Sequence, residues 1–400
     1  MNTLIFFIAG LSHIWNGDAV NFSGGLKSNY TFPKDFVFGV STAAIQIEGA
    51  SNEDGKTESI WDNLVRTNPK FTKDGSTPAV AADSHGIAEY LCAHNLLKAH
   101  ASVYHLFDRQ YRPIYGGKIG MSLDSNWAEP KGNTSSDVKA AELYLKTHLG
   151  WYAHPVYSSE GNYPPELIKL VDEKSRLQNY TRSRLPKFTP EEVEHIKGTA
   201  DFFGLNHYTT YLLSMADGEV GQIPSHENDV GIVRVQNPKW PSMSSSDWLK
   251  VVPFGFRRLL AWISKTYNNV PIIVTENGYA DFSGIHDTAR VTYYCHYLNA
   301  LLHAIHEDKS NVHGYFAWSL MDNWEWDDGF VSRFGLYLVD FESKNKTRTA
   351  KDSARLYSSV VSSRGLPDNY DPEDYSAFSG ASTILIPTVL LLLPMYRLLL

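Results

Sequence analysis

Five short apolar runs, each followed by polar residues and then by helix-like sequence, constrain the fold of this 400-residue chain more than any other feature. They occupy residues 36–43, 118–124, 201–209, 271–277 and 312–322, and residues 289–307 carry leucine and isoleucine at the spacing of an amphipathic helix. Parallel strands that are buried on both faces have this apolar composition, and alternation of strands with helices favours an α/β fold. We expect the functional side chains at the carboxyl ends of these strands.

Reactive or ligand-binding side chains stand at or just beyond the ends of three of these runs. They are Asn206, Tyr208, Glu276, Trp318, Glu325 and Trp326. TIM-barrel enzymes assemble their sites from residues placed in this way on several strands. Purely structural roles are the alternative: Trp318 can be a core residue, and Tyr208 can be a strand residue with a satisfied hydroxyl.

The composition excludes some classes of function. A net charge of −8 and a pI near 6.0 give no reason to expect nucleic acid as a partner. The 13% of aromatic residues suits a site that stacks against flat ligand faces, although large cores have similar contents. The 15 histidines show no spacing typical of a metal site, so we expect neither a metal nor a cofactor.

The two ends of the chain indicate targeting rather than fold. The apolar run at residues 4–11, followed by the small residues Gly17 and Ala19, predicts a signal peptide over residues 1–19. Residues 366–383 are expected to form a linker, and residues 384–400 a hydrophobic tail. The tail resembles a GPI-anchor signal, and a tail-end membrane helix is the alternative.

N-x-S/T sequons support the same route through the secretory pathway. They begin at Asn21, Asn29, Asn133, Asn179 and Asn345. We therefore expect a membrane-anchored glycoprotein in the secretory pathway, at the cell surface or outside the cell. Cys92 and Cys295 are too few to build a disulfide framework, and the sequence leaves open whether they pair.

Three long motifs resemble those of glycoside hydrolase family 1, the family of β-glucosidases, myrosinases and lactase-like proteins. They are FPKDFVFGVSTAAIQIEGA at residues 32–50, VTENG at 274–278 and WSLMDNWEWDDGF at 318–330. The resemblance extends over residues 32–365 and implies a hydrolase domain built on a TIM (β/α)8 barrel. It also implies a retaining β-glycosidase that acts on O- or thio-β-glucosides.

The resemblance assigns a role to each candidate residue. Glu276 would be the nucleophile that forms a glycosyl-enzyme intermediate, which requires an ionised carboxylate, and Tyr208 would orient it. The residues expected to bind or border the sugar are Gln46, Asn206, Trp318, Glu325, Trp326 and Phe334.

The family pattern is interrupted after about residue 85. The segment VAADSH at 80–85 runs directly into GIAEYLCAHNLLKAHA at 86–101, whereas three βα units separate such segments in the family. Three units correspond to about 100 residues. We therefore expect an incomplete barrel without strands two to four, and without the Asn-Glu-Pro motif that supplies the family's acid/base glutamate.

The expected gap has two consequences. Loss of the acid typically costs about 10²–10⁴-fold in rate, and less for good leaving groups. A barrel of five strands exposes two sheet edges. We expect Glu129, in the segment NWAEP, to be a loop residue rather than a replacement acid.

Three interpretations follow for the whole chain: a membrane-tethered β-glycosidase, a sugar-binding pseudo-enzyme, or a non-functional splice or gene-model variant. The sequence leaves the aglycone, the exact sugar and the oligomeric state open.

Overall fold

The structure, a computed structural model, describes residues 26–48, 86–216, 223–242, 248–282 and 284–378, with isolated positions at 53, 55, 57, 59, 63 and 245. The predicted signal peptide, the Asn21 sequon, the hydrophobic tail, the last residues of the linker and the junction at 80–85 lie outside the described residues. Within the described ranges, no helix combines the length and apolar character needed to cross a membrane.

Five parallel strands form the central sheet, in the order β1-β8-β7-β4-β2. Their bounds are Val37–Ser41 for β1, Gly120–Asp124 for β2, Phe202–Asn206 for β4, Ile272–Asn277 for β7 and Val312–Trp318 for β8. Each lies inside one of the five apolar runs, so the strand predictions are confirmed.

The strand order agrees with that of neighbouring strands in a (β/α)8 barrel. Within the sheet the first strand, β1, pairs with the last, β8, and this is the pairing that closes such a barrel. Among the described residues no strand pairs with the free edges of β1 and β2, so the sheet is open between them.

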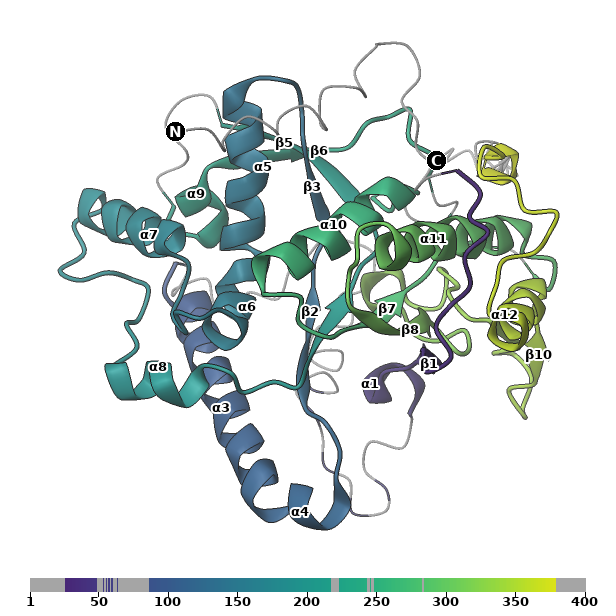
Figure 1. The fold of residues 1–400 in the computed structure, drawn as a ribbon, viewed down its shortest axis with the longest axis horizontal. Coiled ribbons are helices and arrows are strands. Elements are labelled where there is room, and N and C mark those ends of the chain that lie inside the picture. Colours follow the sequence, from purple (N-terminus) through teal and green to yellow (C-terminus); the bar gives the residue numbers. More distant parts are fainter. Residues whose placement is uncertain are drawn as a thin grey trace, which may run out of the picture.

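Helices cover the outer face of this sheet, and Figure 1 shows α10 and α11 lying across it. α10 spans Pro253–Thr266 and α11 spans Thr288–His306, the helix predicted at 289–307. α12, Asp352–Ser363, packs beside α11. Fully buried side chains of these helices, including Leu259 and Leu301, meet Phe203 and Val274 of the sheet in the main hydrophobic core.

A second group of helices covers the side of the sheet near β2. α3 spans Ala88–Gln110, α5 Ser135–Thr147, α6 Leu149–Tyr157, α7 Pro165–Leu177 and α8 Pro190–Ile196. Tyr90 and Leu97 of α3 pack with Trp151 of α6 in a separate hydrophobic cluster. The opposite side of α3 exposes apolar residues, including Leu96, which is 53% exposed.

The remaining elements are short. β3 Trp127–Pro130, β5 Thr210–Met215 and β6 Ile232–Val235 form a second sheet, and β9 Tyr337–Val339 pairs with β10 Arg348–Ala350. The short helices are α1 Ala44–Ile47, α4 Arg112–Tyr115, α9 His226–Val230, η1 Trp326–Asp328 and η2 Ser376–Phe378. The two cysteines, Cys92 and Cys295, are both free thiols.

Candidate active site

Glu276 lies near the carboxyl end of β7, next to the end of β4. The Tyr208 hydroxyl, just beyond β4, donates a hydrogen bond of 2.8 Å to Glu276 Oε2. The backbone N–H of His207 donates to the Glu276 carbonyl oxygen at 3.0 Å. The two strands that the sequence predicted to carry reactive residues therefore bring this tyrosine and this carboxylate into contact.

An irregularity in the pairing of β4 with β7 places Glu276. Leu205 pairs with Val274, but the next residue, Asn206, pairs with Glu276, so Thr275 is an extra residue in β7. The Thr275 hydroxyl donates to Asn206 Oδ1 at 2.6 Å. A bulge of this kind re-aims side chains and is frequent beside active sites.

The side-chain amide of Asn277, the last residue of β7, holds the end of this strand in place. Its Nδ2 donates to the His207 carbonyl at 2.7 Å and to the Tyr293 hydroxyl at 2.8 Å. Its Oδ1 accepts from the Tyr315 hydroxyl at 2.7 Å. Because Asn277 is fully buried, these bonds hold the residue next to Glu276 rigidly.

Burial raises the pKa of Glu276, and the negative charge of Asp124 raises it further. The hydrogen bond from Tyr208 lowers this pKa and so opposes both effects. Burial, followed by the Glu276 charge, raises the pKa of Tyr208 far above its ordinary value, so Tyr208 remains a hydrogen-bond donor. This pairing favours the ionised carboxylate that a nucleophile needs.

A second polar group lies at the end of the same sheet, where α1 meets the loop after β8. Gln46 Nε2 donates to Asn323 Oδ1 at 3.0 Å and to the Trp324 carbonyl at 2.6 Å, and lies 3.4 Å from Glu325 Oε2. Gln46 and Glu325 are 6% and 7% exposed. The structure thus brings these two residues, 279 positions apart, into one buried cluster.

Glu325 has an unusual electrostatic state. Its Oε1 has no hydrogen-bond partner among the described residues although it is buried. Burial raises the pKa of Glu325 to about 8, and hydrogen bonds to Trp318 and Asn323 only partly oppose this effect. A buried oxygen without a partner is costly, and a ligand hydroxyl would satisfy it.

The aromatic candidates surround these carboxylates. Trp318, at the end of β8, is 4% exposed, whereas Trp326 in η1 is 37% exposed and lies 5.6 Å from Trp324 between ring centroids. Phe334 meets the Tyr208 ring edge to face at 6.0 Å. Trp318 belongs to the hydrophobic core and is the last residue of β8, and its contact with a sugar stays a prediction.

Gly278 allows β7 and β8 to approach closely beyond Glu276. A Cβ at this position would lie 1.9 Å from the Trp318 carbonyl oxygen. The same oxygen accepts a hydrogen bond from Tyr294 at 3.2 Å. A larger residue at 278 would therefore push apart the strand ends that carry Glu276 and Trp318.

Asp124, which no sequence motif indicated, ends β2 beside Asn206. It occupies the last position of a predicted strand run, which is the same signal that identified Glu276. Burial raises the pKa of Asp124 to about 6, while the side chain keeps access to solvent.

Glu129 lies elsewhere. It belongs to β3 in the second sheet, so the expectation of a loop residue is wrong in this detail. Arg258 Nη1 contacts both carboxylate oxygens at 2.6 Å, and Trp127 Nε1 donates to Oε2 at 2.6 Å. The Glu129 carboxylate is therefore engaged by partners of its own, Arg258 and Trp127.

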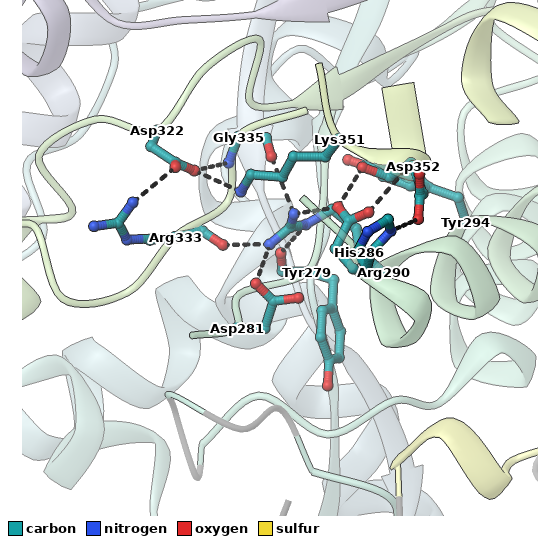
Figure 2. A network of polar contacts seen from close by, with 12 residues as sticks. Tyr279, Asp281, His286, Arg290, Tyr294, Asp322, Arg333, Gly335, Lys351 and Asp352 are labelled. Atoms are coloured by element: carbon teal, nitrogen blue, oxygen red, sulfur yellow. Dashed lines mark hydrogen bonds and ion pairs between the residues drawn. The ribbon is translucent and has the colours of Figure 1, made fainter. Parts of the chain in front are cut away.

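A network of buried charges supports the loops around the site (Figure 2). At its centre Arg290, on α11, contacts Asp281 and Asp287 at 2.5 Å each and donates to the Tyr279 carbonyl at 3.0 Å. Arg290 also donates to the backbone carbonyls of Arg333 and Gly335. It therefore connects the loop after Glu276 to the loop that carries Glu325 and Phe334.

Asp322 extends this network on the other side. Its Oδ1 lies 2.8 Å from Lys351 Nζ and accepts from the Gly335 N–H at 3.0 Å. Its Oδ2 lies 3.4 Å from Arg333 Nη1 and accepts from the Val339 N–H at 3.3 Å. The segment between β8 and β9 is thus folded around one carboxylate.

No group of three or more His, Cys, Asp or Glu residues in the described part of the chain could hold a metal ion. The sequons within the described ranges, at Asn29, Asn133, Asn179 and Asn345, all have exposed asparagines.

Comparison with known proteins identifies the family to which this arrangement belongs. Residues 28–89 and 83–366 match the profile of glycosyl hydrolase family 1. The chain therefore belongs to this family of TIM-barrel enzymes, and by family it is a β-glucosidase-like glycoside hydrolase.

Individual relatives differ in how much of their length this chain spans. It is 31% identical to Myrosinase 1 of Brevicoryne brassicae over 464 aligned positions, covering 84% of this chain and 99% of the relative. It is 41% identical to human lactase/phlorizin hydrolase over 297 residues, which are 74% of this chain but only 15% of that protein.

Solved structures show the same fold. An aphid myrosinase superimposes with a TM-score of 0.75 at 30% identity, covering 83% of this chain and 99% of the myrosinase. A rice β-glucosidase mutant, described in a covalent complex with Glc, gives a TM-score of 0.63 at 32% identity, covering 74% of this chain and 63% of the rice protein.

Proposed function

We propose that this chain is a retaining β-glycosidase of the β-glucosidase type that is glycosylated on Glu276 by O- or thio-β-glucosides. The observation that carries the proposal is the 2.8 Å hydrogen bond from Tyr208 to Glu276 at the end of a parallel sheet. A retaining enzyme needs an ionised carboxylate to attack the anomeric carbon. The rice relative in a covalent complex with Glc supports the same chemistry.

Binding of the nonreducing sugar is assigned to the cluster of Gln46 and Glu325. The amide of Gln46 supplies donor and acceptor atoms, and Glu325 Oε1 has a free acceptor position. Trp318 and Trp326 provide flat faces for the sugar ring, and Asn206 and Phe334 border the same space. These assignments follow the family motifs and agree with the clustering of the side chains.

The acid/base glutamate of the family is absent from this chain in our proposal. The alignment with the B. brassicae myrosinase contains 464 positions although it includes only 84% of 400 residues, which supports an internal gap of roughly three βα units. The open edges of β1 and β2 lie where such units would pair. A site with no replacement for the family acid would favour substrates with good leaving groups.

A labelling experiment tests this proposal. The purified full chain is incubated with dinitrophenyl 2-deoxy-2-fluoro-β-D-glucoside, and the labelled peptide is mapped by mass spectrometry. We expect one fluoroglucosyl group on Glu276, no label in Glu276→Gln, and normal labelling in the control Glu173→Gln on α7. A cooperatively folded chain that takes up no label, or that is labelled elsewhere, would contradict the proposed nucleophile.

A sugar-binding pseudo-enzyme is the second candidate, favoured by the buried acceptor on Glu325 together with the missing family acid. It predicts protection against thermal unfolding by glucose or a glucoside without any covalent label. A chain that neither folds cooperatively nor binds glucose would instead support the non-functional variant.

We also propose that the protein is secreted, N-glycosylated and anchored to a membrane by its hydrophobic tail. The exposed positions of Asn29, Asn133, Asn179 and Asn345 support glycosylation. Expression in cells with a secretory pathway should give a product whose mass falls on treatment with N-glycosidase. Release by phosphatidylinositol-specific phospholipase would identify a GPI anchor, whereas resistance to both phospholipase and alkaline extraction would identify a membrane helix.

A further inference from the structure

Three neighbouring strands, β7, β4 and β2, place paired residues in one row at the carboxyl edge of the sheet. Glu276 pairs with Asn206, and Asn206 pairs with Asp124. Paired residues of parallel strands point to the same face of a sheet. The side chain of Asp124 therefore emerges on the same face as that of Glu276, two strands away.

We propose that Asp124 is the general acid/base of this chain, acting opposite Glu276. This inference rests on the proposed function and assigns the proton-transfer role to a residue of the remaining arc. Nothing in the family motifs points to this residue.

The pairing register places the two carboxylates two strands apart. Neighbouring strands lie about 4.8 Å apart, so the backbones at positions 124 and 276 are separated by roughly 10 Å. Both side chains emerge on the same face of the sheet, and the two carboxylates are near enough to interact electrostatically. Glycosidase carboxyl groups lie about 5–5.5 Å apart in retaining enzymes and up to about 9.5 Å apart in inverting ones, because a sugar or water must fit between them.

The surroundings of Asp124 keep it available for proton transfer. No hydrogen bond or ion pair holds its carboxylate within the described residues, whereas Glu129 is bound by Arg258. The groups that interact electrostatically with Asp124 are Glu276 and Tyr208 on one side and Tyr144 and Tyr211 on the other. Arg234 Nη1 donates to the Tyr144 hydroxyl at 3.4 Å, on the side of Tyr144 and Tyr211.

Burial also raises the pKa of Asp124 to about 6, so a substantial fraction of the carboxyl group keeps its proton in mildly acidic solution. The pKa of a general acid is most effective when it lies near the working pH. Asp124 is nevertheless exposed to solvent, and it lies on β2, the edge strand of the sheet formed by the described residues. Asp124 can thus donate its proton to a leaving group and be approached by water.

The reaction balances with these two carboxylates. The Glu276 carboxylate attacks the anomeric carbon, the bond to the glycosidic oxygen breaks, and Asp124 donates its proton to that oxygen, which releases the aglycone alcohol. Asp124, now ionised, takes a proton from a water molecule whose oxygen attacks the same carbon. The bond to Glu276 then breaks, and the sugar leaves with its original configuration.

The test compares Asp124→Asn and Asp124→Ala with the unmodified chain on two substrates. With methyl β-glucoside, whose leaving group needs a proton, we expect kcat/KM to fall by about 10²–10⁴-fold in both variants. With dinitrophenyl β-glucoside, the first burst of dinitrophenol should change by less than about threefold. The control variant is Glu129→Gln. Any change that it causes in kcat/KM should be the same for both leaving groups.

Azide provides a second readout. In Asp124→Ala it should accelerate turnover of the dinitrophenyl substrate and yield β-glucosyl azide, because the small anion replaces water without needing a base. Equal losses on both substrates, an absence of azide rescue, or a chain that is labelled on Glu276 but inactive on methyl β-glucoside would overturn the role of Asp124 and leave the nucleophile intact. Failure of labelling would instead overturn the proposed function.

Discussion

Lys351 Nζ lies 2.8 Å from Asp322 Oδ1, and neither side chain is exposed to solvent. This ion pair joins the first residue before α12 to the loop that carries the proposed sugar-binding residues. Removal of one partner leaves a buried charge uncompensated, which is far more costly than loss of a surface pair. The loss of unfolding free energy on breaking this pair therefore measures how strongly the ion pair stabilises the loop.

Replacement of Lys351 by methionine should lower the free energy of unfolding by about 3–5 kcal/mol. Chemical denaturation followed by tryptophan fluorescence measures this loss. The matched control is Arg355→Gln, which removes an exposed ion pair to Asp352 on the same helix and should cost less than about 1 kcal/mol. Similar losses in the two variants would show that the buried network does not stabilise the loop.

Replacement of Tyr208 by phenylalanine should raise the pKa of Glu276, because the Tyr208 hydroxyl stabilises the ionised carboxylate. A hydrogen bond to a charged group contributes about 1.5–3 kcal/mol, equivalent to about one to two pKa units. The acid limb of the pH profile for fluoroglucoside labelling should move to higher pH by this amount. Tyr152→Phe, on α6, serves as the control, and an unshifted profile in Tyr208→Phe would refute the orienting role.

Glu325 should make the protein less stable as the pH rises. Its pKa in the fold is about 8, compared with an ordinary value of 4.5, so the folded chain holds a proton that the unfolded chain releases within this window. The free energy of unfolding therefore falls between about pH 4.5 and pH 8.

Glu325→Gln removes this titration and should be more stable than the unmodified chain near pH 8, by on the order of a few kcal/mol. The two proteins should differ much less near pH 4.5. Denaturant titrations at both pH values measure the effect, and glucose should protect the variant less well from thermal unfolding. A constant stability difference across the pH range would contradict the raised pKa.

Replacement of Gly278 by alanine should abolish labelling of Glu276 while leaving most of the fold intact. The added Cβ would collide with the backbone carbonyl of Trp318, which cannot move without displacing β8. Gly284→Ala is the control, because a Cβ there meets nothing within 4 Å. Far-ultraviolet circular dichroism and peptide mapping separate the local effect from unfolding, and full labelling of Gly278→Ala would disprove the constraint.

Leu96 and Leu97 are adjacent on α3 but face opposite environments, at 53% and 0% exposure. Exposed apolar residues promote association. Leu96→Lys should reduce self-association, measured by light scattering, with little change in stability. Leu97→Lys should destabilise the chain by several kcal/mol because it buries a charge. Equal effects of the two substitutions would show that α3 packs differently.

The sequence predicted those parts of the fold that depend on local pattern. The central strands are apolar runs of five to seven residues that end in polar side chains, and each was found within its expected range. The second sheet was not predicted, because Thr210–Met215 follows Tyr208 after a single residue and reads as a continuation of the previous run.

The sequence predicted candidate site residues only where they lie in a recognisable motif. Glu276 and Glu325 lie in long recognisable segments, whereas Asp124 ends a predicted strand without any motif. The pairing of Glu129 with Arg258 joins residues 129 positions apart, and the contact of Gln46 with Glu325 joins residues 279 apart. No local pattern encodes such distances, since they result from packing of the whole sheet.

The extra residue in β7 has a consequence for insertions and deletions. In a regular strand Thr275 and Glu276 would point to opposite faces, yet here the Thr275 hydroxyl reaches Asn206 while Glu276 pairs with the same residue. Loss or gain of one residue in this segment would turn the carboxylate to the other face of the sheet, even with every side chain retained. The length of this segment therefore constrains the site as strictly as its chemistry does.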